Sequence, residues 1–169
     1  MTKGLAVLSA VLGSVLVVSG CSGGGGSVSR TSPGLGSEWD AKAGAPEVAA
    51  FMRIDVPKDA TGVKGAVAVN PQEDNYLLSF VTGERTAERL AAGLHAPEPL
   101  RPQAVATAAG ATNALFEHLG LTPPDRLRKV RRAGVCPPCV ERDRGRVQWI
   151  EIYVHALGGG RARVYLLAY

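Results

Sequence analysis

The sequence of 169 residues lacks the short motifs that point most directly to an enzyme or a repeat protein. It has no internal repeat, no nucleophile elbow, no phosphate-binding loop and no paired carboxylates. Cysteine is scarce, with three residues, and no apolar run reaches the roughly 20 residues that cross a bilayer as a helix. The chain therefore carries no motif for a solenoid, a phosphate-binding enzyme or an α/β-hydrolase, and no cofactor is predicted.

The charge balance is only mildly basic. Lysine and arginine number 19 and aspartate and glutamate 15, which gives a formal net charge of +4. Removal of residues 1–20 would take away Lys3 alone and leave a charge of +3. Nucleic-acid-binding domains usually show a larger basic excess, so nucleic acid is not an expected partner.

The N-terminal segment has the composition of a signal peptide. Lys3 supplies a positive charge, and the fifteen residues from Leu5 to Ser19 contain no charged side chain. This apolar run is short for a permanent membrane anchor, and the small residues at its end favour cleavage. A segment rich in glycine and serine begins directly after Cys21.

Val18, Ser19, Gly20 and Cys21 match the lipobox pattern of one apolar residue, two small residues and a cysteine. Residues 1–21 therefore resemble the signal peptides of bacterial lipoproteins. The resemblance implies diacylglycerol on the Cys21 sulfur, cleavage before Cys21 and anchoring at the extracytoplasmic face of the cell membrane. Two or three acyl chains hold a protein much more firmly than one. An ordinary secretory signal with an incidental cysteine is the alternative.

Composition divides the chain into three regions. Residues 1–20 are the signal peptide, residues 21–36 are the lipidated cysteine and a flexible tether, and residues 37–169 are a single α+β domain. A tether of this length and composition reaches about 20 Å. Trp39 follows it and is predicted to be a lid on the domain, with an interfacial aromatic side chain as the alternative.

The first half of the domain predicts a hairpin. Residues 46–56 fit either a short helix or an extended segment, and a turn cluster follows at Pro57 to Gly62. The β-type runs Gly65 to Val69 and Tyr76 to Val81 are then joined by a polar loop, which indicates two antiparallel strands. Residues 54–63 also resemble an opening found in small uncharacterised actinobacterial lipoproteins, and this resemblance implies no particular activity.

The middle of the domain predicts two helices. The first covers residues 83–92, with Thr82 as its N-cap and Gly93 as a left-handed stop. An apolar stripe at helical spacing from Val105 to Leu119 predicts the second, which Gly120 closes.

The last third predicts three strands, over residues 126–132, 147–157 and 161–168. Their alternation places Ile150, Ile152 and Val154 on one face and leaves the opposite face, with Trp149 and Tyr153, half-exposed. The predicted fold is α+β, a two-layer sandwich of an antiparallel sheet and two main helices in the order β-β-α-α-β-β-β.

Cys136 and Cys139 remain after Cys21 is assigned to lipid, and an even pair outside the cytoplasm is expected to form a disulfide. Thiol–disulfide exchange would favour Cys136 at the N-terminus of a helix. The two intervening prolines and the charged stretch after Cys139 predict no helix there. The expected role is therefore a disulfide that pins a hairpin loop, and redox exchange is the alternative.

The sequence also contains residues that bear on a metal site and on a cationic surface. The three histidines, His95, His118 and His155, lie on different predicted elements, so no metal site is predicted. Basic residues crowd the stretch from Arg126 to Arg146, without interleaved aromatic residues for single-stranded nucleic acid. The side chains of such a run are usually solvated. If the run has a function, we expect it to contact anionic headgroups or wall polymers. The candidate contact residues are Arg128, Lys129, Arg131, Arg132, Arg142, Arg144 and Arg146.

These patterns together predict a lipid-anchored, extracytoplasmic lipoprotein that acts as a non-enzymatic binding or accessory module. Its expected contacts are the membrane, through lipid on Cys21, and a partner in the cell envelope. The alternative function is an extracytoplasmic thiol–disulfide protein that uses Cys136 and Cys139.

Overall fold

The computed structural model describes residues 38–105, 113–141 and 146–169. The predicted signal peptide, Cys21 and the tether lie outside the described residues, as do Arg142 and Arg144. In the part of the chain that is described, no helix is long and apolar enough to cross a membrane.

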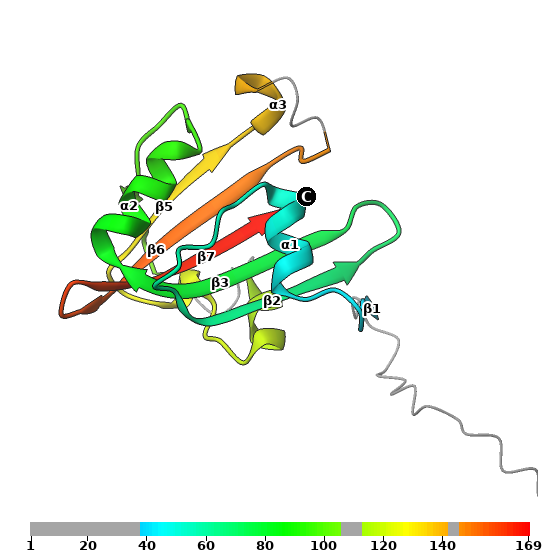
Figure 1. The fold of residues 1–169 in the computed structure, drawn as a ribbon, viewed down its shortest axis with the longest axis horizontal. Helices are drawn as coiled ribbons and strands as arrows, with labels where there is room; N and C mark the ends of the chain where they lie inside the picture. The colour runs from blue at the N-terminus through cyan, green and yellow to red at the C-terminus, as the bar shows by residue number, and fades with distance from the viewer. Residues whose placement is uncertain (1–37, 106–112, 142–145) are drawn as a thin grey trace, which may run out of the picture. The chain divides into compact units, whose positions relative to one another are not determined.

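The described residues form one antiparallel sheet of seven strands, in the spatial order β1-β2-β3-β7-β6-β5-β4 (Figure 1). The strands are β1 Glu38–Trp39, β2 Thr61–Val69, β3 Asn75–Gly83, β4 Arg101–Pro102, β5 Val130–Val135, β6 Ile150–Gly158 and β7 Arg161–Ala168. The hairpins predicted from the β-type runs are therefore confirmed as β2–β3 and β6–β7. Each strand of the first hairpin is longer than the run that predicted it.

The β6–β7 hairpin shows why the alternation was a reliable guide. Ile152 pairs with Leu166 and Val154 with Val164, and all four side chains are buried on the same face of the sheet. The turn between the strands uses Gly158, Gly159 and Gly160 at φ of 87°, 59° and 70°. Side chains with a Cβ rarely adopt these angles, which explains the run of glycines.

Two helices, α1 Ala45–Met52 and α2 Glu84–Gly93, cover that apolar face (Figure 1). The segment that fitted either a helix or an extended chain is thus helical at its start. Helix α1 lies very close to β2, because a Cβ built on Gly65 would stand 2.5 Å from the Cα of Ala45. Fully buried Val48, Met52 and Ala87 join the sheet in the larger hydrophobic cluster.

The opposite face of the sheet carries a second hydrophobic cluster. Leu77, Tyr153 and Tyr165 are buried there under Phe116, and Leu115 and Leu119 pack at the margin. The covering segment contains the 3-10 helices η2 Ala114–Leu119 and η3 Pro124–Arg126. The prediction that this face is half-exposed is therefore wrong around Tyr153.

The second predicted helix is found only in part. Its C-terminal portion is the 3-10 helix η2, which ends at Gly120 in the left-handed conformation as expected. Residues 106–112 of the predicted helix lie outside the described residues, and Val105 is exposed. The apolar side chains Leu115, Phe116 and Leu119 belong to the second cluster and not to the first.

Three local predictions are wrong for identifiable reasons. Thr82 does not cap α2, because its buried hydroxyl donates to the Asp59 carboxylate at 3.0 Å. Gly93 is the last residue of α2, and the left-handed position is His95, at φ of 54°. The strand predicted over residues 126–132 starts later, at Val130, because Lys129 turns the chain at φ of 58°.

The fold is mixed α+β and consists mostly of strands. It includes the predicted sequence of a hairpin, a helix and three later strands. The structure adds α1 and the short strands β1 and β4, and it covers part of the second sheet face.

Candidate functional site

Two cavities flank strand β5, and the segment Pro97 to Leu100 runs between them. We call the first the α2 cavity, which has a volume of about 270 Å³, and the second the Trp149 groove, with about 460 Å³. Glu98, Pro99 and Ala133 line both of them. A cavity in the range of about 300–1,000 Å³ is typical of small-molecule sites, which makes the groove the larger candidate.

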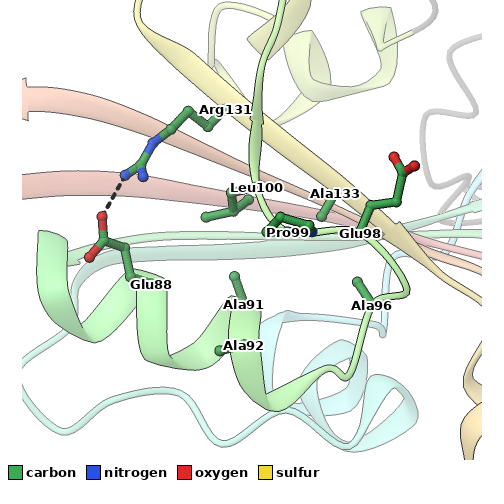
Figure 2. Close-up of a pocket in the computed structure, with 9 residues that line it drawn as sticks. All are labelled: Glu88, Ala91, Ala92, Ala96, Glu98, Pro99, Leu100, Arg131 and Ala133. Carbon is green, nitrogen blue, oxygen red and sulfur yellow. Dashed lines mark hydrogen bonds and ion pairs between the residues drawn. The ribbon is translucent and has the colours of Figure 1, made fainter.

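The α2 cavity has apolar walls and an ionic rim (Figure 2). Ala91 and Ala92 from α2 face Pro99 and Leu100 across it. At one end Arg131 donates to Glu88 at 2.8 Å and to Glu84 at 3.5 Å. Arg131 therefore ties β5 to α2, and both of its carboxylate partners come from that helix.

The Trp149 groove lies on the opposite side of β5. Its residues come from the proline-rich segment before β4, from the strands β4, β5 and β6, and from Trp149 just before β6. They are Pro97, Glu98, Pro99, Arg101, Pro102, Arg132, Ala133, Gly134, Trp149 and Glu151. An aromatic ring, two guanidinium groups and two carboxylates thus meet in one depression.

The indole of Trp149 lies directly on the backbone of Gly134. A Cβ built on Gly134 would stand 2.5 Å from Cζ2 and 3.1 Å from Cε2 of Trp149. The Trp149 backbone is also fixed, since its N–H donates to the Tyr169 carbonyl at 3.0 Å and its carbonyl accepts from the Tyr169 N–H at 3.2 Å. The position of the ring is therefore set by close packing below it and by two backbone hydrogen bonds.

A chain of hydrogen bonds runs from the groove into the interior. The Tyr153 hydroxyl donates to the Glu151 carboxylate and accepts from Nδ2 of Asn113 at 3.0 Å. The Asn113 N–H in turn contacts Oδ2 of Asp125 at 3.4 Å. Burial, and then the hydrogen bond to Glu151, raise the pKa of Tyr153 well above its ordinary value. The phenol therefore stays neutral and holds Glu151 at the edge of the groove.

Several buried polar atoms on this side lack a partner among the described residues. They include Oδ1 of Asn113 and Oδ1 of Asp125, although both residues are almost completely buried. Nη1 of Arg163 is also buried and has no hydrogen-bond partner among the described residues. Arg163 lies on β7, where it pairs with His155 of β6. Burial, and then the positive charge of Arg163, lower the pKa of His155 below its ordinary value.

Cys136 and Cys139 are joined in a disulfide, with their Cα atoms 5.3 Å apart. Cys136 directly follows β5 and precedes a single helical turn, α3 Pro137–Val140. The expectation that no helix follows Cys136 is therefore wrong, because the two prolines occupy the first turn, where a missing N–H costs nothing. The disulfide lies within the β5–β6 connection, with Cys139 exposed and Cys136 half-buried.

The structure separates the basic residues that the sequence brought together. Arg131 points to α2 and Arg132 lines the Trp149 groove on the other side of the sheet. Arg126, from the same stretch, pairs with Glu117 at 2.6 Å. The described candidates Arg128, Lys129, Arg131, Arg132 and Arg146 do not share one face, and the anionic-contact surface stays a prediction.

The three histidines are also apart. His95 contacts Glu141 at 3.3 Å, His118 stacks on Trp39 with ring centroids 3.7 Å apart, and His155 lies on β6. Trp39 is half-buried at the edge of the second hydrophobic cluster, as a lid would be. Among the described residues, no group of three or more His, Cys, Asp or Glu side chains is arranged to hold a metal ion.

Sequence reasoning missed the Trp149 groove, because the alternation places Trp149, Glu151 and Tyr153 on the face of the sheet that was predicted to be half-exposed. Two aromatic residues at alternate positions on the polar side of a strand were the available signal. No family model matches the chain, and searches of curated proteins and of solved structures found no match.

Proposed function

We propose that this chain is a lipid-anchored, extracytoplasmic binding or accessory lipoprotein and that the Trp149 groove is its ligand-binding surface. The observation that carries the binding role is the composition of the groove, where a fixed indole ring lies beside two guanidinium groups and two carboxylates. Binding sites commonly combine an apolar platform with a few polar groups that orient the ligand. The unidentified partner belongs to the cell envelope.

The anchor part of the proposal rests on the sequence. Lipid on Cys21 and a tether through residue 36 would hold the domain within about 20 Å of the headgroups. We further propose that the sheet with α1 and α2 forms a two-layer scaffold, on which the groove lies on the side of β5 opposite α2. A rigid scaffold lowers the entropic cost of binding.

Site-specific photo-crosslinking on intact cells tests the binding role. A benzophenone amino acid in place of Pro97, an exposed residue at the wall of the groove, should give a discrete adduct with an envelope component and leaves Trp149 in place. The matched control places the same residue at Leu157, which is exposed near the β6–β7 turn and outside the groove. Equal labelling from both positions, or none from position 97, would count against a binding role for the groove.

A second candidate function is thiol–disulfide exchange. The helical turn that follows Cys136 supports it, and so does the exposure of Cys139. Exchange would make Cys136→Ser or Cys139→Ser trap mixed disulfides with other envelope proteins. Because α3 is a single turn, with little dipole to stabilise a thiolate, we expect a non-reducing gel to show no trapped partner for either variant.

A further inference from the structure

We propose that the Trp149 groove binds an acidic sugar, with the sugar ring on the indole of Trp149 and the sugar carboxylate on Arg132. This inference rests on the proposed binding role of the groove and names its ligand class. The argument uses the pairing of the charges in the groove, the fixed aromatic ring and the polar groups around it.

Of the two arginines that line the groove, only Arg101 forms an ion pair among the described residues. Arg101 contacts Glu98 at 3.1 Å, and Glu151 accepts the hydrogen bond of the Tyr153 hydroxyl. Arg132 is exposed and makes no ion pair with a carboxylate among the described residues. A guanidinium group donates two parallel hydrogen bonds to a carboxylate, so Arg132 is the position for a ligand anion.

The neighbouring Arg131 provides the contrast. It belongs to the same strand, but its side chain lies on the other side of the sheet and contacts two carboxylates of α2. The sequence therefore holds one arginine that stabilises the fold and, next to it, one that faces a groove. This difference gives a matched control for any test of Arg132.

Trp149 supplies a surface for a ring. Its indole is held on Gly134 and is only half-buried, and prolines 97, 99 and 102 line the groove with it. Proline and a packed indole lose little conformational freedom when a ligand binds. An aromatic face of this kind favours the C–H face of a sugar or another flat group.

The carboxylates of Glu98 and Glu151 indicate which further groups the ligand must carry. Phosphate could meet Arg132, but with few hydrogen-bond donors it would leave the carboxylates of Glu98 and Glu151 without partners from the ligand. Hydroxyl groups donate hydrogen bonds, and both carboxylates have oxygen atoms that can accept them. A ring with several hydroxyls and one carboxylate matches the platform, the acceptors and Arg132 together.

Isothermal titration of the full-length protein in detergent micelles tests the inference, with galacturonic acid as the acidic probe and galactose as the neutral one. We expect binding of the acidic probe and at least about tenfold weaker binding of the neutral probe, since one charge-assisted contact is lost. Arg132→Gln should weaken acidic-probe binding about tenfold, and Trp149→Ala should weaken both probes. Arg131→Gln should leave the affinity within about twofold, and circular dichroism should show that each variant is folded.

Equal affinities for the acidic and the neutral probe, or an equal loss in the Arg131 and Arg132 variants, would overturn the inference. Tighter binding of adenosine monophosphate than of galacturonic acid would also overturn it, in favour of a nucleotide. If neither sugar binds while position 97 still gives a discrete crosslink on cells, the sugar assignment fails and the proposed binding role stands. If the crosslink is absent too, both fail.

Discussion

Tyr153 connects the surface of the groove to the interior of the domain. It is 1% exposed, and its hydroxyl bridges Glu151 and Asn113. Tyr153→Phe removes this bridge and leaves the buried amide of Asn113 without its acceptor. We expect the free energy of unfolding to fall by about 1–3 kcal/mol in urea denaturation. Tyr169→Phe, outside this hydrogen-bond chain, should have a smaller effect, and equal losses would contradict the assigned role of Tyr153.

His155 makes the stability of the domain sensitive to acid. Its pKa in the folded protein lies below its ordinary value of 6.5, because of burial and then of Arg163. The unfolded chain therefore takes up a proton first, and the stability present above about pH 6.5 decreases as the pH falls through the folded pKa. His155→Gln should reduce the loss of thermal stability between pH 7 and pH 5. Parallel curves for the variant and the wild type would rule out this contribution.

The α3 turn and its disulfide are expected to stabilise the β5–β6 connection and to have little effect on the rest of the sheet. The loop closed between Cys136 and Cys139 is short, so the chain-entropy model assigns it about 2 kcal/mol. The double substitution to serine should lower the free energy of unfolding by about that amount or less, without loss of the sheet. Far-ultraviolet circular dichroism and chemical denaturation measure the two quantities. A variant that fails to fold would show that the β5–β6 connection depends on the disulfide.

At the scale of strands and helices, the sequence predicted the structure best where side chains alternate along a strand and one face of that strand is buried. The β6–β7 hairpin followed from alternation and three consecutive glycines, whereas β5 began later than expected because Lys129 takes a left-handed conformation. A run of basic residues is compatible with a turn as well as with a strand, so the sequence pattern could not locate the start of β5. The apolar residues near Phe116 showed helical spacing, yet they cover the second sheet face from a 3-10 helix.

The candidate site was less predictable than the strands, for a related reason. Its residues come from the proline-rich segment, from β5 and from the chain around the start of β6, and only the sheet register brings Arg132 and Glu151 into one groove. Local sequence patterns carry no information on which distant segments meet. Arg131 pairs with α2 and Arg132 is the arginine of β5 that lines the groove, which is likewise a property of the folded chain.

The molecule as a whole is proposed to act at a membrane surface through lipid on Cys21, and this claim determines where its groove would meet a ligand. Labelling of growing cells with radioactive palmitate tests it most directly. The wild-type protein and the Cys136→Ser/Cys139→Ser variant should both incorporate label, because neither change affects Cys21. Cys21→Ser should remain an unlabelled precursor that retains residues 1–20. Label in Cys21→Ser equal to that of the wild type, or no label in the wild type, would contradict the lipoprotein assignment.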